Sequence, residues 1–259
     1  MLPLELTLVL AATRDMGIGL NGTLPWTGLK KEMAYFARVT KRVPPSSPPP
    51  SQQQQPALNA VIMGRKTWDS IPARFRPLRG RLNIVISRSA PLLLFPSATA
   101  VENAETNVVV MAPSLEQALA YLQQQHTSSS PSHSRNSSSE TTLGKIGRVF
   151  IIGGAQMYDA ALALRETRRI LLTRVLTDFA CDTFFPLAAL QQNVSNGDDG
   201  EKKKKMAGVE EEMQEVEREG GEWKRRGQAA LDAWAGEAVP AGVQEENGTR
   251  YEFQMWERD

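Results

Sequence analysis

Short apolar runs that alternate with helical patterns constrain the fold of this chain more than any other feature. Strand-like runs occur at Leu4–Ala12, Leu58–Met63, Leu82–Ile86, Val108–Met111, Val149–Ile152, Arg169–Leu176 and Arg250–Trp256. Helical patterns occur between several of them, at Leu29–Val39, at Ser114–Gln124, which starts on an N-cap serine, and at Ala155–Leu164. This alternation predicts an α/β fold with a largely parallel central sheet flanked by helices on both faces. The last strands follow one another without helices, which predicts an antiparallel edge at the C-terminus.

Low-complexity segments interrupt this pattern. Residues 43–56 are rich in proline and glutamine, residues 127–142 in serine, and residues 191–221 in lysine and glutamate. Such segments have little apolar surface to bury, so we interpret them as surface insertions within one domain that spans residues 1–259. The charged tract could instead form an exposed helix, and the insertions could dock partners rather than be inert.

Composition excludes several classes of function. A formal net charge of +1 favours neither nucleic acid nor a membrane surface as a partner. The single cysteine, Cys181, fits a reducing compartment, so we expect a cytoplasmic protein. The apolar N-terminus lacks the basic region of a signal peptide and is better interpreted as a strand. Both histidines, His126 and His133, lie in the serine-rich segment, so the chemistry must depend on carboxylates, backbone groups or a cofactor.

Two glycine motifs follow apolar strands. Residues 17–22 match the GxGxxG pattern, but a loop with Pro25 and Trp26 follows instead of a helix, so we reject a dinucleotide fingerprint there. That segment is either a flexible glycine-rich loop or a mobile lid over a site. Gly153-Gly154 separates a strand from a helix, where the helix N-terminus could receive a phosphate. Close packing alone would also explain this pair.

Cations and hydroxyls mark further strand ends. Gly64-Arg65-Lys66-Thr67 follows one strand, and Ser87-Arg88 follows the next. Together with the two glycines, they predict a phosphorylated nucleotide lying across the carboxyl edge of the sheet. An additional arginine favours a 2′-phosphate, hence NADP over NAD. Taken singly, each group could equally be a solvated charge.

Glu32 is the carboxylate that the helical pattern singles out. Leu29, Met33 and Phe36 share one face of the expected helix, and Glu32 lies on or beside this apolar stripe. Burial would raise its pKa and keep it partly protonated near neutrality. Glu32 could also be an ordinary boundary residue of an amphipathic helix.

Taken in order, these motifs resemble the dihydrofolate reductase family, in its eukaryotic and fungal form. The resemblance covers the chain apart from the insertions, and its motifs are Met16–Gly22 with Leu24-Pro25-Trp26, Leu29–Phe36, Val61–Trp68, Ser70-Ile71-Pro72, Arg76–Arg81, Ile151–Gly154 with Tyr158, Leu172-Thr173-Arg174, Asp182–Pro186 and the final hairpin Val243–Glu257. It implies the fold of that family and reduction of dihydrofolate to tetrahydrofolate with NADPH, without a metal.

The resemblance also implies roles for individual residues. Glu32 would hold the pterin and help deliver a proton through water, with Trp26 and Thr173 as the other catalytic residues. The folate site would contain Ala11, Met33, Phe36, Ile71, Leu78, Arg81, Ile152 and Tyr158, with Arg81 pairing to the α-carboxylate of the glutamate tail. The NADPH site would contain Ala12, Ile18, Gly22, Gly64, Arg65, Lys66, Thr67, Ser87, Arg88, Gly153, Gly154, Ala155, Gln156 and Met157. A monomer that also binds antifolate inhibitors is implied.

Departures from the family pattern leave alternatives open. Met33 stands where vertebrate members carry phenylalanine, and Phe75 occupies a usually polar position before the Arg76 motif. Both should alter inhibitor fit more than the reaction. The insertion at residues 43–56 could slow product release if it folded over the site. A pteridine or riboflavin-pathway reductase on the same fold is a rival, which Arg81 argues against because a substrate without a glutamate tail has no use for it. A non-catalytic homologue that binds folate or RNA is the other rival.

Overall fold

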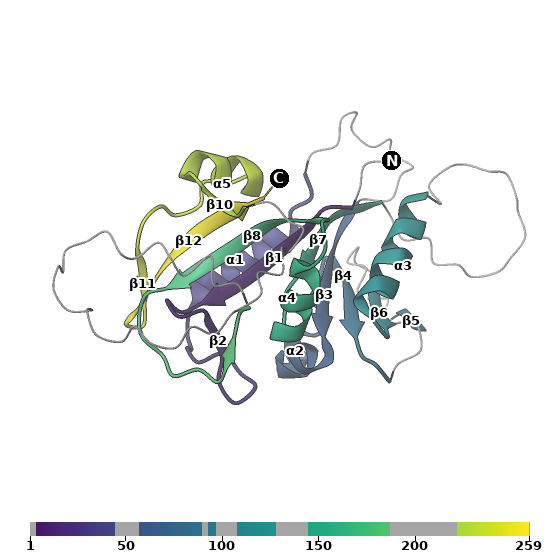
Figure 1. Ribbon diagram of the computed structural model, residues 1–259, viewed down its shortest axis with the longest axis horizontal. Coiled ribbons are helices and arrows are strands. Elements are labelled where there is room, and N and C mark those ends of the chain that lie inside the picture. Colours follow the sequence, from purple (N-terminus) through teal and green to yellow (C-terminus); the bar gives the residue numbers. More distant parts are fainter. Residues whose placement is uncertain are drawn as a thin grey trace, which may run out of the picture.

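The computed structural model describes residues 4–44, 57–89, 93–96, 108–127, 145–186 and 222–258. Within these residues one large sheet runs through the molecule with helices on both faces (Figure 1). Its strand order is β10-β12-β8-β1-β7-β3-β4-β6-β5, with β11 also paired to β12. The expected insertions at residues 43–56, 127–142 and 191–221 lie outside the described residues, apart from residues 43–44 and 127.

The centre of the sheet is parallel, as the sequence predicts. Its strands are β1 (Leu6–Ala12), β3 (Leu58–Gly64), β4 (Arg81–Ile86), β6 (Val108–Ala112), β7 (Ile146–Ile151) and β8 (Thr167–Val175). Strands such as β1 and β4 are buried along almost their whole length because helices cover both faces. That is why the sequences of these strands are continuous apolar runs and do not alternate between apolar and polar residues.

Antiparallel strands complete both edges. On the C-terminal side, β12 (Thr249–Glu257) pairs with β8 and carries β10 (Lys224–Arg226) and β11 (Gln244–Glu246). Asn247 and Gly248 join β11 to β12 with φ values of 49° and 73°, the left-handed backbone that a tight hairpin turn requires. The predicted antiparallel C-terminal edge is confirmed. At the other edge β5 (Leu93–Pro96) runs antiparallel to β6, which the sequence did not indicate.

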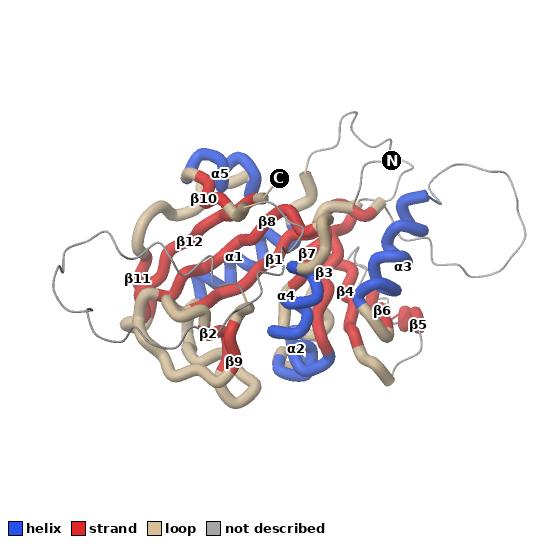
Figure 2. Tube along the Cα trace, viewed as in Figure 1, coloured by secondary structure: helices blue, strands red, loops and turns tan. Residues whose placement is uncertain are grey.

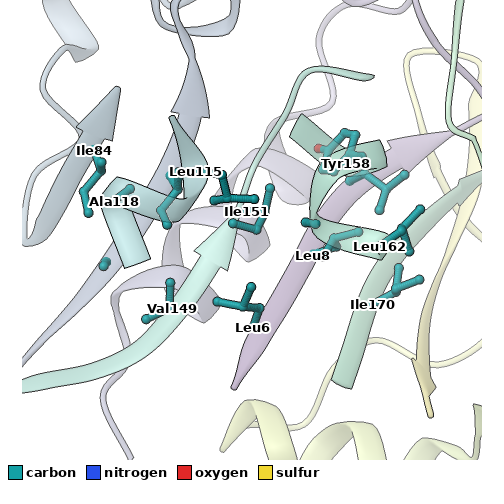
Figure 3. Packing of buried hydrophobic residues seen from close by; sticks show 14 of the residues in the cluster. Leu6, Leu8, Ile84, Leu115, Ala118, Val149, Ile151, Tyr158, Leu162 and Ile170 are labelled. Carbon is teal, nitrogen blue, oxygen red and sulfur yellow. The ribbon is translucent and has the colours of Figure 1, made fainter. Parts of the chain in front are cut away.

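The helices form two layers, each with its own apolar cluster. On one face α3 (Leu115–Thr127) and α4 (Ala155–Leu162) bury their apolar residues against the sheet. Figure 3 shows Leu115 and Ala118 of α3 and Leu162 of α4 beside the strand residues that they cover. On the other face lie α1 (Lys30–Lys41) and α5 (Gln228–Ala235), with α2 (Arg65–Ser70) at its edge; η1 (Ala73–Phe75) follows α2. The fold therefore rests on one sheet with a core on each side.

The chain reverses its direction of travel across the sheet between β1 and β7. From β1 the chain passes through α1 to β3, beyond β7, whereas from β7 it passes through α4 to β8, beyond β1. Connections that diverge in this way leave a crevice at the carboxyl ends of the two strands, where α/β proteins bind ligands. Ala11 and Ala12 lie at the end of β1, and Ile152-Gly153-Gly154 follow β7.

The glycine-rich segment after β1 is a short strand, not a helix start. β2 (Gly17–Gly19) pairs with β9 (Thr183–Phe184) in a separate two-stranded sheet, visible in Figure 2. The approach is close, since a Cβ on Gly17 would lie 2.3 Å from Sγ of Cys181. The backbone N–H of Asn21 also donates to Asp182 Oδ2 at 2.7 Å. Residues 23–29 form no helix and α1 begins only at Lys30, so the segment lacks the direct strand-to-helix turn of a dinucleotide fingerprint.

Candidate active site

Glu32 lies in the first turn of α1, and its side chain is buried, with 8% exposed. Thr173 Oγ1 on β8 donates a hydrogen bond to Glu32 Oε1 at 3.2 Å. The pKa of Glu32 is raised to about 7, and burial is the largest cause. The hydrogen bond from Thr173 opposes this rise, whereas the nearby carboxylate of Glu246 adds to it. Thr173 is also the register partner of Ala11, so Glu32 stands over the carboxyl ends of β1 and β8. A carboxyl group that titrates near neutrality can exchange a proton with a ligand.

The buried stripe of α1 differs from the one expected. The helix buries Glu32, Tyr35, Val39 and Thr40, whereas Met33 is 53% exposed. The prediction that Met33 shares the buried face of Leu29 and Phe36 is therefore wrong. The orientation of α1 directs Glu32 towards the sheet and leaves Met33 exposed. Met33 stands beside Glu32 in the sequence but outside the packed core.

Most of the expected folate residues belong to one apolar cluster. Ala11, Phe36, Ile71, Leu78 and Ile152 are partly buried against the core that α1 covers. Trp26 is buried in the same core, and its ring meets Phe179 edge-on at 5.7 Å between centroids. Trp26 Nε1 is buried without a hydrogen-bond partner among the described residues. A buried donor of this kind is available to a water molecule or a ligand.

Arg81 is a buried cation near this cluster. Its guanidinium donates to Thr40 Oγ1 at 2.7 Å and to the Arg79 carbonyl at 3.2 Å, and it lies 5.9 Å from the Phe36 ring centroid. No carboxylate among the described residues forms an ion pair with it. Burial lowers the pKa of Arg81 to about 10. A buried guanidinium without a carboxylate favours binding of an external anion.

Gly153 and Gly154 form a compact turn between β7 and α4. Their peptide bond is cis, and Gly153 has a φ of 117°, which favours glycine. The Gly64 N–H donates to the Gly153 carbonyl at 2.8 Å, which joins the turn to the start of α2. A Cβ on Gly154 would lie 3.4 Å from Thr67 Oγ1, so a side chain there would crowd α2. Gly154 caps α4 without any side-chain hydrogen bond to the first N–H groups of that helix.

The remaining expected ligand residues surround this turn or lie further along the edge. Ala155 and Gln156 begin α4, and Met157 packs near Gly64. The Tyr158 hydroxyl donates to the Val9 carbonyl at 2.9 Å, so this buried residue supports β1 in addition to any contact with a ligand. Arg65, Lys66 and Arg88 are exposed, Ser87 is buried, and Ala12 and Ile18 pack against the other core. Gly22 is exposed with a φ of 75°.

Glu246 is a site residue that the sequence did not reveal. The hairpin that carries it was expected, but its contact with α1 was not. Its carboxylate accepts the Lys31 N–H at 3.0 and 2.9 Å and the Glu32 N–H at 3.3 Å. These partners lie more than two hundred residues apart in the chain, so no local pattern could indicate the contact.

Comparisons with known proteins agree with this geometry. The family model described as dihydrofolate reductase matches residues 53–218. Dihydrofolate reductase from Pneumocystis carinii is 37% identical over 98% of this chain and 97% of its own length. The Cryptococcus neoformans enzyme of that name is 35% identical over 97% and 94%. Among solved structures, Schistosoma mansoni dihydrofolate reductase is 26% identical with a TM-score of 0.57, covering 98% of both chains.

The fold, its topological switch point between β1 and β7, and these similarities together define an oxidoreductase. The chain belongs to the dihydrofolate reductase family, and its resemblance to fungal members is supported by the Pneumocystis and Cryptococcus relatives. Membership implies a small-molecule substrate and a nicotinamide cofactor. No helix in the described part of the chain is both long and apolar enough to span a membrane.

Proposed function

We propose that the chain reduces 7,8-dihydrofolate to 5,6,7,8-tetrahydrofolate with NADPH, and that Glu32 assists protonation of the pterin ring. The observation that carries this proposal is the buried Glu32 carboxyl group, which Thr173 holds over the carboxyl ends of β1 and β8. Its pKa of about 7 leaves a large protonated fraction at neutral pH. An ordinary exposed glutamate would be almost wholly ionised there.

Glu32 acts by holding the pterin and supplying a proton to it. Its oxygens accept the amino and ring N–H groups of the pterin, and the protonated form passes a proton, through water, to the nitrogen beside the reduced carbon. The unpartnered Trp26 Nε1 supports this step because it offers a buried donor to such a water molecule. Thr173 keeps the carboxyl group in one orientation.

Residues at the Gly153-Gly154 turn fit a dinucleotide. A Cβ on Gly153 would lie 3.3 Å from Tyr158 Oη, so the turn has no room for a side chain there. In the described part of the chain the N-terminus of α4 has no side-chain cap, and the N–H groups of Ala155 and Gln156 are suited to a phosphate. Three further residues of the expected cofactor site adjoin this turn: Gly64, Thr67 and Met157. Family resemblance assigns the remaining ones to the same ligand: Ala12, Ile18, Gly22, Arg65, Lys66, Ser87 and Arg88. When bound, NADPH supplies the hydride that reduces the pterin.

Arg81 orients the other end of the substrate. Its buried guanidinium lacks a carboxylate in the described part of the chain, and the α-carboxylate of the glutamate tail provides one. We assign to the folate site five residues that pack against one apolar cluster, together with the exposed Met33 and the buried Tyr158; the five are Ala11, Phe36, Ile71, Leu78 and Ile152. We further propose that residues 1–259 form one domain that acts as a cytoplasmic monomer and binds antifolates.

The test is oxidation of NADPH, followed by its near-ultraviolet absorbance, when dihydrofolate is added to the purified full chain. We expect rapid oxidation that methotrexate abolishes, and a loss of about 100-fold or more in Glu32→Gln. Folded protein without turnover would contradict the proposal. Equal turnover of a dihydropterin that lacks the glutamate tail would favour the pteridine-type rival, and equal turnover by Glu32→Gln would remove Glu32 from the mechanism.

A further inference from the structure

The N-terminus of α1 is capped by a residue from the last hairpin. Leu29, at the N-cap position, makes no side-chain hydrogen bond to the helix. Both oxygens of Glu246 instead accept the Lys31 N–H, at 3.0 and 2.9 Å, and Oε1 also accepts the Glu32 N–H at 3.3 Å. The first N–H groups of a helix need such acceptors because no earlier carbonyl is available to them. A carboxylate also suits the positive end of the helix dipole.

Glu246 is itself held in place. The Tyr251 hydroxyl on β12 donates to Glu246 Oε1 at 2.5 Å, across the same hairpin. Beyond the cap, the Asn247 side chain donates to the Gly28 carbonyl at 2.8 Å, so the hairpin tip contacts the segment that leads into α1. The hairpin thus fixes both the position of the carboxylate and the place where the helix begins.

This cap changes the electrostatic surroundings of Glu32. A carboxyl group in the first helical turn would normally be stabilised in its charged form by the helix dipole and the free N–H groups. Glu246 accepts those N–H groups itself and adds a like charge beside Glu32. We infer that Glu246 is a positioning residue that keeps Glu32 in its proton-donating form, by capping α1 in place of the Glu32 carboxylate. This inference rests on the proposed function of Glu32.

The tyrosines that face Glu32 do not change charge in the range where it titrates. Thr173 faces it from β8, Tyr251 from β12 and Tyr35 from its own helix, while Lys31 is the adjacent cation on α1. Burial raises the pKa of both tyrosines, so they stay neutral where Glu32 titrates. Burial alone would raise the pKa of Glu246, but its bonds from Tyr251 and the α1 backbone hold that pKa below the usual value. Glu246 is therefore ionised throughout the titration of Glu32.

The experiment measures the titration of Glu32 directly and through turnover. The Glu32 carboxyl carbon is followed by NMR against pH in the ligand-free full chain, with Glu32→Gln to assign its signal. In Glu246→Gln we expect the midpoint to fall by about half a pH unit or more. The pH at which turnover declines should fall by the same amount, while the rate at low pH is kept.

Matched variants separate charge from structure. Glu245→Gln removes the same charge from the adjacent, exposed position of the hairpin and should leave the midpoint unchanged. Glu246→Asp retains the charge and should return the midpoint towards that of the unmodified chain. Glu246→Ser, a second variant without the charge, should reproduce the shift and serves if Glu246→Gln fails to fold.

The outcomes distinguish this inference from the proposed function. A midpoint in Glu246→Gln and Glu246→Ser equal to that of Glu245→Gln overturns the inference, as does an equal loss of turnover at every pH. Absence of turnover in the unmodified chain, with the NMR shift still present, contradicts only the proposed function.

Discussion

Glu32 weakens the fold that holds it, and the cost depends on pH. Its pKa is about 7 in the folded protein against 4.5 when exposed, so between these values the folded state keeps a proton that the unfolded chain has released. Stability therefore falls as pH rises through this window, by about 3 kcal/mol at most. We expect Glu32→Gln, which cannot ionise, to be more stable than the unmodified chain at pH 8 and similar to it at pH 4.5. Urea unfolding of both proteins at both pH values measures the difference in their free energies of unfolding. An equal difference at pH 8 and pH 4.5 would contradict the expected pH dependence.

Arg81 should determine affinity for the substrate tail rather than the chemical step. Arg81→Lys keeps the charge but loses the two parallel N–H groups that match a carboxylate. We expect kcat/KM for dihydrofolate to fall by about 10- to 100-fold, mainly through KM, because a charged hydrogen bond is worth roughly 1.5–3 kcal/mol. Steady-state kinetics with a tail-less dihydropterin should show no difference between the two proteins. Arg79→Lys, on the exposed turn beside it, is the matched control.

At the scale of elements, α1 is held at both ends by residues distant in sequence. Glu246 caps its N-terminus, and at its C-terminus the buried Asn59 side chain donates to the carbonyls of Thr40 and Arg42 at 2.9 and 3.0 Å. Asn59 Oδ1 also accepts the Arg148 N–H at 2.9 Å, which ties the helix end to β7. The orientation of Glu32 thus depends on contacts with β3, β7 and the final hairpin.

Removing the C-terminal contact should be costly. Asn59→Ala leaves the Arg148 N–H without its acceptor and two helix carbonyls without their donor, in a site where Asn59 is fully buried. We expect a loss of about 3 kcal/mol, since each buried unsatisfied group costs roughly 1–3 kcal/mol and two of the three bonds are only part-buried. Chemical denaturation measures this loss. A cost no larger than that of Ser114→Ala, which removes a local cap worth about 1 kcal/mol, would contradict it.

Locally encoded features were the predictable ones. The Ser114 cap of α3 was predicted and is confirmed, because the Gln117 N–H donates to Ser114 Oγ at 3.3 Å. The raised pKa of Glu32 followed from helical spacing, although Met33 proved to be exposed. The Glu246 and Asn59 contacts were not predictable, because each joins segments whose proximity only the sheet establishes. The same holds for the contact of Gly17 with Cys181.

At the scale of the whole molecule, the C-terminal residues 222–258 complete both the sheet and the site. β12 pairs with β8 over Tyr251–Glu257, from Glu257 opposite Arg169 to Tyr251 opposite Val175. This places Glu246, which the Tyr251 hydroxyl holds, against the N-terminus of α1, which precedes it by some two hundred residues. Alternation of strands and helices predicted the parallel core because each unit is local. The alternation could not predict β5, β10 or α5. These elements are short, and their positions depend on tertiary contacts with the rest of the sheet rather than on a local pattern.

The two apolar cores on the faces of the sheet are formed by described residues other than 191–221. We therefore expect residues 191–221 to be dispensable for folding and turnover. Replacing it with a glycine-serine linker of about 15 residues should preserve the folded state and turnover, because loop closure changes only slowly with length, by about 0.6 kcal/mol per doubling. Circular dichroism, thermal unfolding and NADPH oxidation measure the outcome. Deleting Gln228–Ala235 is the contrasting control, since α5 buries Leu231 and Ala235 in the core beneath α1 and its loss should prevent folding. Folded protein whose turnover fell after the linker replacement would show instead that residues 191–221 contribute to the site, and the insertion would have to be treated as part of the enzyme.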